Sequence, residues 1–235
     1  MILPVKDKIV AIVPGAGIGK RFGPGANKPF EFLGGKPLMI WVLETLEAID
    51  EISEIIPVIK NENMGFSAEL IEEHRISKVR RIAPGGPERQ DSVYNGLRLV
   101  EDRESIVLVH DGVRPLLEPA LVRKAIAALC DCDGVVVGVP VKDTVKEVSG
   151  GMIRKTYDRR RLWAIQTPQV FRYTVLHAAY EKAIAEAFYA TDDSALVERF
   201  GGAVRIVQGS YTNIKITTPE DIQIAELFLK TRGQG

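Results

Sequence analysis

An apolar run that leads straight into a glycine-rich, cationic loop is the feature that most constrains the fold. Residues 9–13 are all apolar, and Gly15, Gly17 and Gly19 follow them. Positive charge comes from Lys20, Arg21 and Lys28. Glycines let the main chain approach a ligand closely, so that several N–H groups can converge on an anion. The pattern predicts a first buried strand that ends in a phosphate-binding loop, and the ligand we expect is a nucleoside triphosphate.

Two common phosphate-binding motifs do not fit this loop. The dinucleotide fingerprint G-x-G-x-x-G, counted from Gly15, has Lys20 in the third glycine position. Counted from Gly17, it has Phe22 there. A P-loop needs one more residue between Gly15 and Gly19, and a hydroxyl residue after the lysine. A solvated surface turn is the alternative, but the position after the first strand favours a ligand loop, since open α/β sheets bind ligands at the carboxyl ends of strands.

Apolar strand-like runs alternate with helical patterns along most of the chain. We expect strands at residues 9–13, 54–59, 78–82, 106–110, 134–139, 204–208 and 213–216. We expect helices at residues 37–49, 66–74, 91–100, 119–130, 173–187, 193–200 and 219–230. This order predicts a single Rossmann-like α/β domain over residues 1–235, with a mostly parallel sheet and helices on both faces.

Residues 141–161 interrupt this rhythm with two alternating segments around Ser149-Gly150-Gly151. Such a pattern predicts a protruding β-hairpin arm. A two-stranded hairpin is unstable by itself and needs another surface to lie against. A second copy of the chain could supply that surface, so we expect a homodimer that forms through the arm.

The composition excludes several classes of partner. Lys+Arg and Asp+Glu both number 31, so the net charge is zero and nothing draws the whole chain to nucleic acid or to an anionic membrane. No apolar run approaches the ~20 residues that span a bilayer, and no signal-peptide pattern opens the sequence, so we expect a cytoplasmic protein. Cys130 and Cys132, with three histidines in the chain, are too few for a zinc site and are expected to be reduced thiols.

Polar residues at the ends of the predicted elements are the candidate site residues. Asp111 ends an apolar strand, where a carboxylate can hold a magnesium ion that bridges phosphates, although a turn or cap role is the alternative. Gly85 and Gly86 precede a helix that carries Ser92, and this turn could bind a base edge or serve only as a cap. Further small donors or cations occur at residues 166–169, 191–194 and 213–217.

Taken in order, these segments resemble the 2-C-methyl-D-erythritol 4-phosphate cytidylyltransferase family of the non-mevalonate isoprenoid pathway. The resemblance spans nearly the whole chain, and the ordered set of motifs is more specific than any one of them. The motifs are G-A-G-x-G-x-R from Gly15 with Lys28, Gly-Gly-x-x-Arg-x-Asp-Ser at 85–92, Val-His-Asp-x-x-Arg-Pro at 109–115, Pro-Val-Lys-Asp-Thr at 140–144, Asp158-Arg159, Gln-Thr-Pro-Gln at 166–169, Thr-Asp-Asp at 191–193 and Asn-Ile-Lys-Ile-Thr at 213–217.

The resemblance implies a magnesium-dependent transfer of CMP from CTP to methylerythritol phosphate, with release of pyrophosphate. It implies that the phosphates are stabilised by Arg21, Lys28 and Lys215, and that the metal is held by Asp111. It assigns the CTP site to Gly15, Ala16, Gly17, Gly19, Gly86 and Ser92. It assigns the methylerythritol phosphate site to Thr144, Arg159, Thr167 and Thr191. Thr144 and Arg159 lie on the arm and would serve the neighbouring subunit's site.

The expected chemistry needs no general base. A phosphate monoester with a second pKa near ~6 is largely dianionic at neutral pH, so it is already a nucleophile. Cations and a metal ion then neutralise the charge of the transition state. Three positions depart from the family pattern: Gly15 replaces an alanine, Asn27 replaces a proline, and Pro87 stands where a polar side chain could touch the base. Because proline has no N–H, base selectivity is the property left open.

Two rival functions remain at the level of the sequence. A cytidylyltransferase that acts on ribitol 5-phosphate would share the fold and the CTP half of the site. A non-catalytic nucleotide-binding regulator, or a glycosyltransferase, could keep the scaffold without nucleotidyl transfer, and Lys28, Lys215 and Asp111 would then be dispensable. A dehydrogenase is disfavoured because the dinucleotide fingerprint fails.

Overall fold

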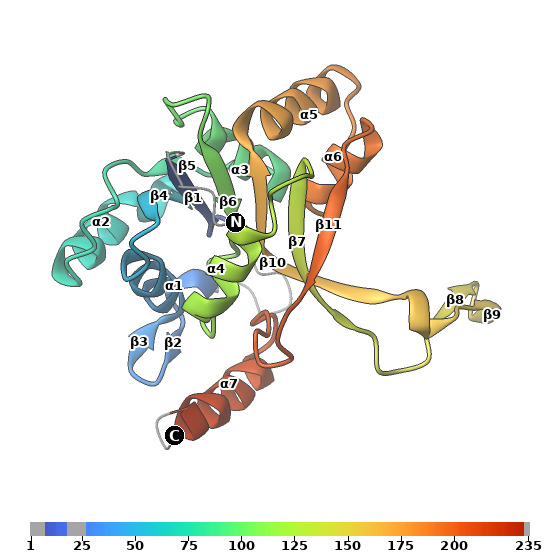
Figure 1. Ribbon diagram of the computed structural model, residues 1–235. Coiled ribbons are helices and arrows are strands. Elements are labelled where there is room, and N and C mark those ends of the chain that lie inside the picture. Colours follow the sequence, from blue (N-terminus) through green and yellow to red (C-terminus); the bar gives the residue numbers. More distant parts are fainter. Residues whose placement is uncertain (1–7, 18–26, 233–235) are drawn as a thin grey trace.

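The computed structural model describes residues 8–17 and 27–232, and a twisted seven-stranded sheet forms its centre (Figure 1). The strand order is β11-β7-β10-β6-β1-β4-β5. The strands are β1 (Ile9–Pro14), β4 (Ile52–Ile59), β5 (Ala83–Pro84), β6 (Ile106–Val109), β7 (Gly134–Pro140), β10 (Trp163–Arg172) and β11 (Val204–Gln208). Only β10 runs antiparallel to its neighbours in this sheet, so the expected mostly parallel sheet is confirmed.

The apolar first strand is buried on both of its faces. Ile9, Ala11 and Val13 belong to one hydrophobic core, whereas Val10 and Ile12 belong to another on the opposite face. Successive side chains of a strand point to opposite faces, so a strand between two cores is apolar throughout. This burial explains why the run has no alternating polar residues.

Helices cover both faces of the sheet, as expected. Helices α1 (Leu38–Glu47), α2 (Met64–Glu73) and α4 (Pro119–Ala127) pack against one face. Helices α3 (Arg89–Leu97), α5 (Tyr173–Ala185) and α6 (Asp193–Arg199) pack against the other. None of the helices in residues 8–17 and 27–232 is long and apolar enough to cross a membrane.

The C-terminal helix lies apart from these layers (Figure 1). Helix α7 (Pro219–Arg232) packs against a small hairpin made of β2 (Phe32–Leu33) and β3 (Lys36–Pro37). Ala225 of the helix joins Leu33 in a third, smaller hydrophobic cluster. The expected start of this helix at Pro219 is confirmed.

The hairpin arm extends away from the sheet (Figure 1). Its strands are β8 (Lys146–Ser149) and β9 (Met152–Thr156), and every residue of both strands is exposed. Gly150 and Gly151 join them with φ angles of 58° and 76°, a backbone conformation that favours glycine. The predicted hairpin is therefore confirmed, with strands shorter than the 141–161 pattern.

Two predicted strands are wrong. Residues 78–82 form only an isolated bridge to β4, at Val79. At the start of this segment, the Glu47 carboxylate accepts the N–H groups of Ser77 and Lys78 at 3.1 and 2.9 Å, so a side chain and not a neighbouring strand binds them. The strand at this edge is β5, which starts only at Ala83. Residues 213–216 form no strand, since side chains hold this segment, as described below.

Strand β10 was not predicted from the sequence. Its register against β7 shifts between Gln166 and Gln169, and the intervening Thr167–Pro168 pair hid the strand pattern. A bulge of this kind turns side chains toward a different direction and is common beside active sites.

Candidate active site

The candidate site lies at the carboxyl ends of the central parallel strands. The chain goes from β1 to β4 and then β5 on one side, and returns to β6 on the other side of β1. This reversal is a topological switch point, where open α/β sheets bind their ligands. Residues 15–17 follow β1 and Asp111 follows β6, so both lie at this crevice.

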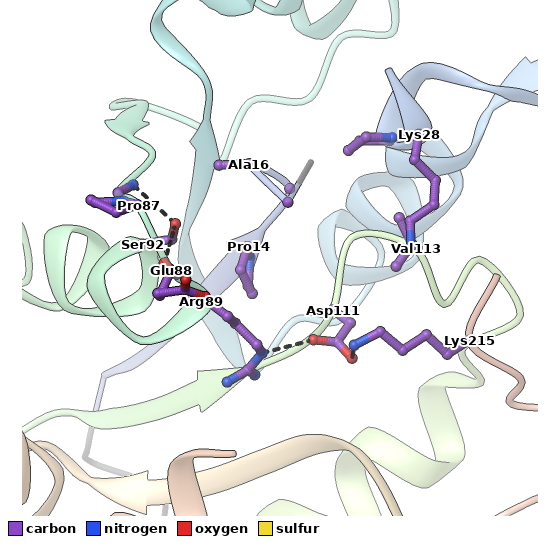
Figure 2. Close-up of a pocket in the computed structure, with 14 residues that line it drawn as sticks. Pro14, Ala16, Lys28, Pro87, Glu88, Arg89, Ser92, Asp111, Val113 and Lys215 are labelled. Carbon is purple, nitrogen blue, oxygen red and sulfur yellow. Dashed lines mark hydrogen bonds and ion pairs between the residues drawn. The ribbon is translucent and has the colours of Figure 1, made fainter. Parts of the chain in front are cut away.

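A first pocket of about 370 Å³ opens at the switch point (Figure 2). Most of the residues expected at a CTP site line it: Gly15, Ala16, Gly17, Gly86 and Ser92. It is also lined by the expected charged residues Lys28, Asp111 and Lys215. Gly19 and Arg21 lie outside the described residues, so their roles remain predictions.

The Gly85–Gly86 turn fits closely against the start of α3. A Cβ on Gly86 would lie 2.3 Å from the Cβ of Asp91 and 3.1 Å from the backbone nitrogen of Ser92, so a larger residue cannot fit without a backbone shift. The Ser92 hydroxyl accepts the Gly86 N–H at 3.0 Å and donates to the Glu88 carbonyl oxygen at 3.0 Å. Ser92 thus holds the shape of the turn, and a direct contact between Ser92 and a base stays a prediction.

Asp111 is the buried centre of the site, with only 5% of its surface exposed. Three cations surround its carboxylate. Arg89 Nε lies 3.2 Å from Oδ1, while Arg114 Nε and Lys215 Nζ lie 3.3 and 2.9 Å from Oδ2. Figure 2 shows Arg89 and Lys215 reaching the carboxylate from opposite sides. The arrangement gathers positive charge around one fixed negative charge.

These cations determine the ionisation of the site. Burial by itself would raise the pKa of Asp111, but the charges of Arg89, Lys215 and Arg114 hold it well below its usual value. Burial would likewise lower the pKa of Arg89, but the carboxylates of Asp193 and Asp111 raise it well above its usual value. Asp111 and Arg89 are therefore both charged at neutral pH.

A second pocket, of about 400 Å³, adjoins the first. The two pockets share Arg89, Asp111 and Lys215 in their linings. The expected acceptor-site residues Thr167 and Thr191 both line the second pocket. Two cavities that meet at a cation-ringed carboxylate could hold two anionic molecules next to each other.

The two arm residues of the predicted site lie elsewhere. Thr144 and Arg159 are exposed and line neither pocket. Arg159 Nη1 donates to the Lys142 carbonyl oxygen at 2.6 Å, which is a contact within the arm. In the single chain, the structure does not bring these residues to the other site residues.

His110 and Thr167 fix the backbone beneath the carboxylate. The Thr167 hydroxyl accepts the Asp111 N–H at 3.0 Å and lies 3.1 Å from His110 Nδ1. His110 Nε2 lies 3.3 Å from the Arg114 carbonyl oxygen. Burial lowers the pKa of His110 to about 4, because desolvation disfavours the imidazolium. This histidine is therefore neutral at pH 7 and supports the site.

Side-chain hydrogen bonds hold the loop that carries Lys215. Arg114 Nη1 donates to the Asn213 carbonyl oxygen at 2.9 Å, and Asn213 Nδ2 donates to the Thr167 carbonyl oxygen at 2.8 Å. The Ile216 N–H donates to the Val113 carbonyl oxygen at 2.9 Å. These bonds replace the strand pairing that the sequence pattern had predicted.

Helix α2 anchors the short helical turn that carries Lys28. This turn, η1 (Lys28–Phe30), follows Asn27, whose Oδ1 accepts a hydrogen bond from Asn63 Nδ2 at 3.1 Å. The rings of Phe30 and Phe66 also pack edge to face, with centroids 5.4 Å apart. Asn27, one of the departures from the family pattern, therefore has a defined partner.

Four residues of the site had no individual role predicted from the sequence: Arg89, Arg114, Asp193 and Asn213. All four lie inside the motifs that carried the family resemblance. Arg89 and Arg114 each reach Asp111, which the spacing of an arginine from an acid could have suggested. Asp193 pairs with Arg89 across a separation of 104 positions, for which the sequence has no local signal.

The acidic residues fit a metal ion only together with a bound phosphate. Among residues 8–17 and 27–232, no three His, Cys, Asp or Glu side chains form a group that could hold a metal. A carboxylate can accept about four hydrogen bonds, and Asp111 takes three from side chains. Magnesium is commonly held by one or two carboxylates plus substrate phosphates, so a single carboxylate with a free acceptor position is compatible with it.

Comparisons with known proteins agree with the geometry. The model of the family IspD, 2-C-methyl-D-erythritol 4-phosphate cytidylyltransferase, matches residues 9–231. A protein of that name from Geobacter metallireducens is 47% identical over 95% of this chain and 98% of its own length. Another, from Syntrophus aciditrophicus, is 44% identical over 96% and 97%.

Solved structures show the same relationship. The crystal structure of 4-diphosphocytidyl-2C-methyl-D-erythritol synthase from Anaerococcus prevotii has a TM-score of 0.84 and 37% identity, over 95% of this chain and 96% of that one. The 2-C-methyl-D-erythritol 4-phosphate cytidylyltransferase of Thermus thermophilus has a TM-score of 0.76 and 27% identity, over 93% and 98%. From the family match, the identities and the shared fold, the chain belongs to the 2-C-methyl-D-erythritol 4-phosphate cytidylyltransferase family.

Proposed function

We propose that this chain transfers CMP from CTP to 2-C-methyl-D-erythritol 4-phosphate, giving 4-diphosphocytidyl-2-C-methyl-D-erythritol and pyrophosphate. The observation that carries the proposal is that two pockets meet at a buried carboxylate ringed by cations. A reaction between two phosphate-bearing molecules needs such a place, because both anions must be held together while charge gathers between them. CTP would occupy the first pocket and methylerythritol phosphate the second.

In the proposed reaction, a phosphate oxygen of the acceptor attacks the α-phosphorus of CTP. The bond from that phosphorus to the oxygen bridging it to the β-phosphate breaks, and pyrophosphate leaves with the electron pair. The acceptor phosphate is largely dianionic at neutral pH, so no base has to remove a proton. His110 is not placed to act as such a base, since both of its ring nitrogens have partners within the protein and burial lowers its pKa to about 4.

Lysine side chains would stabilise the charge that gathers at the reacting phosphorus. Lys28 lines the first pocket, and Lys215 lines both pockets. Loss of one such contact would cost roughly 3–4 kcal/mol of transition-state stabilisation, on the scale of a single oxyanion donor. Arg21, outside the described residues, would add a further cation from the glycine-rich loop.

The turn at Gly86 offers a way to select cytosine. Its N–H is donated to Ser92, and Pro87 has no N–H, so a base contact there would use carbonyl oxygens. A carbonyl oxygen accepts a hydrogen bond from the amino group of cytosine but not from the corresponding carbonyl of uracil. Ala16 and its glycine neighbours would close the other side of the base site.

Magnesium is part of the proposal, with Asp111 as its protein ligand. The free acceptor position on this carboxylate and the phosphates of CTP would together hold the ion. When bound, it would neutralise part of the charge on the triphosphate. The lysines act on the remaining charge, and Asp111 keeps Lys215 in place at 2.9 Å.

We also propose that the chain works as a cytoplasmic homodimer joined through the arm. Val148, Met152 and Ile153 are large apolar side chains on the arm, each with 59% or more of its surface exposed. A second subunit would cover them, as exposed apolar clusters often mark contact surfaces. Thr144 and Arg159 would then complete the second pocket of that neighbour.

Pyrophosphate release with CTP and magnesium tests the reaction. Methylerythritol 4-phosphate and ribitol 5-phosphate are compared as acceptors, and Lys28→Ala is run beside the wild type. Release with methylerythritol phosphate alone, lost in the variant, is the expected result. Release only with ribitol phosphate would move the chain to the ribitol 5-phosphate reaction, and binding of CTP without release would favour a nucleotide-binding regulator.

Mixing two impaired variants, assayed at a low concentration of methylerythritol phosphate, tests the dimer. Lys28→Ala removes a cation of the first pocket, whereas Arg159→Ala removes a residue of the arm. If the arm serves the neighbouring subunit, a mixed dimer has one site with both residues intact, and activity returns on mixing. No recovery, with dimers confirmed by light scattering, would show that Arg159 does not act across subunits.

A further inference from the structure

Arg89, the first residue of α3, binds two acidic residues from distant parts of the chain. Its Nε donates to Asp111 Oδ1 at 3.2 Å. Its Nη1 and Nη2 donate to the two carboxylate oxygens of Asp193 at 3.1 and 2.8 Å. The same side chain lines both pockets, so its guanidinium is a wall that the two pockets share.

Asp193 sets the position of Arg89 from a place that neither substrate can touch. It is fully buried and lines neither pocket. Its Oδ1 also accepts a hydrogen bond from the Tyr180 hydroxyl at 2.6 Å. A bidentate pair between an arginine and a carboxylate fixes the plane of the guanidinium, and an additional donor fixes the carboxylate. The orientation of Arg89 is therefore set from inside the protein.

The next residues of α3 contact residues 188–193, the segment that ends at Asp193. Gln90 Nε2 donates to the Phe188 carbonyl oxygen, and Gln90 Oε1 accepts the Ala190 N–H, both at 2.9 Å. The Tyr189 hydroxyl donates to Asp91 at 3.2 Å. The first turn of α3 is thus clamped to this segment. The Gly86 turn, which lines the first pocket, adjoins the α3 side of this clamp. Thr191, which lines the second pocket, lies in the other side, residues 188–193.

We infer that Arg89 is a positioning residue that couples the two pockets, so that CTP and the acceptor phosphate strengthen each other's binding. The inference rests on the proposed function, because it takes these two molecules as the occupants of the pockets. A ligand in the first pocket fixes the start of α3 in one position, and the clamp carries that position to residues 188–193. The second ligand then meets a segment that already holds the position it needs, so each ligand favours binding of the other.

The coupling is reciprocal and can be measured from either side. Coupling between two sites is commonly about 5- to 150-fold in affinity, and each ligand changes the affinity of the other by the same factor. The α,β-methylene analogue of CTP cannot release pyrophosphate, so it forms a stable complex beside methylerythritol phosphate. Calorimetry of the analogue, with and without saturating methylerythritol phosphate, gives the coupling factor directly.

Three variants and one control separate coupling from general damage. Asp193→Asn and Arg89→Lys remove the bidentate charge pair, while Tyr180→Phe removes one hydroxyl that touches Asp193. The control is Arg81→Lys, because Arg81 also forms a bidentate pair, with Glu54, and contacts Glu101, but lines neither pocket. Thermal unfolding checks that each variant is folded, and Tyr180→Phe serves if a charge variant does not fold.

The expected coupling factor is at least about fivefold for the wild type and for Arg81→Lys. In Asp193→Asn and Arg89→Lys, the coupling factor should fall to about one. In Tyr180→Phe, which loses one hydrogen bond, the coupling factor should decrease by up to about fivefold. An unchanged factor in Asp193→Asn or Tyr180→Phe, or a wild-type factor of one, would overturn the inference. Wild-type turnover of CTP with methylerythritol phosphate is measured first, and its absence would overturn the proposed function and the inference together.

Discussion

The charged side chains around Asp111 and those on the arm have opposite surroundings. Around Asp111, three cations share one carboxylate that is 5% exposed. On the arm, Arg160 pairs with Asp158 at 2.8 Å, but its side chain is 86% exposed. Buried pairs are hard to break because either partner alone is left without solvation, whereas exposed pairs contribute little to stability.

This difference in burial indicates which charged residues the fold depends on and which are available to another molecule. The cluster around Asp111 is complete within one chain and links β6, α3 and the loop that carries Lys215. The arm has no core of its own, since every residue of β8 and β9 is exposed. Its side chains are thus free to contact a partner, and substitutions there should leave the fold intact.

Asp111→Asn should have the largest effect, on both stability and activity. It leaves the charges of Arg89, Arg114 and Lys215 without their shared carboxylate. Breaking a buried pair costs about 3–5 kcal/mol of the free energy of unfolding. Pyrophosphate release should fall below detection. Urea unfolding followed by circular dichroism measures the first effect, and a coupled pyrophosphate assay measures the second.

The matched control is Asp158→Asn, which breaks a bidentate pair with Arg160 on the arm. Because both partners are exposed, the midpoint of unfolding should not change. If Asp158→Asn destabilises the protein as much as Asp111→Asn does, the contrast between the two regions is wrong.

The buried His110 should make stability depend on pH in a defined range. Its pKa is about 4 in the folded protein, against 6.5 for an ordinary histidine. The unfolded chain therefore binds the proton first as the pH falls, so the free energy of unfolding decreases between pH 6.5 and 4. Below pH 4 both states are protonated at His110, and this group causes no further loss of stability. The shift corresponds to about 3 kcal/mol.

His110→Gln removes this titration and keeps a polar side chain. In metal-free buffer, the free energy of unfolding should differ from that of the wild type by a constant amount between pH 7 and 9. Below pH 6.5 the wild type should lose stability faster than the variant. Parallel curves over the whole range would contradict the assignment to His110.

Arg159→Ala should affect the acceptor alone. A hydrogen bond to a charged group is worth about 1.5–3 kcal/mol, so the KM for methylerythritol phosphate should rise roughly 10- to 100-fold. The KM for CTP and the midpoint of unfolding should stay at wild-type values, because Arg159 is exposed and lines neither pocket. Arg160→Ala is the control, and an equal effect from it would point to general arm charge instead of one contact.

The sequence predicted the sheet, both helical faces and the arm, because each depends on a local pattern. The apolar run of β1 and the two glycines of the arm are such patterns. Local patterns failed at residues 213–216, where alternation suggested a strand but hydrogen bonds from Arg114 and Asn213 determine the conformation. They also failed at β10, where Thr167 and Pro168 interrupt the alternation.

The candidate site shows the same limit. Its glycines, lysines and Asp111 could be predicted, since strand ends and motif order identify them. The pairing of Arg89 with Asp193 could not, because it joins residues that meet only when α3 and α6 pack on the same face of the sheet. Long-range pairs of this kind follow from tertiary packing, which one sequence does not reveal.

Asn63→Ala should have the smallest effect, because its hydrogen bond is neither in the buried cluster nor on the arm. Asn63 Nδ2 donates to Asn27 Oδ1 at 3.1 Å and ties α2 to the turn that carries Lys28. One such bond contributes about 1 kcal/mol, so we expect a fall in turnover of up to about fivefold with a small loss of stability.

Asn61→Ala is the control for this last prediction, since Asn61 lies in the same short turn, η2 (Asn61–Asn63), but is exposed. A fall in turnover confined to Asn63→Ala would mean that Lys28 needs an anchor outside the buried cluster. Equal turnover in both variants would mean that the packing of Phe30 against Phe66 is sufficient to hold the turn. In that case the site would depend on apolar packing as well as on its buried charges, and the contrast with the arm would extend beyond electrostatics.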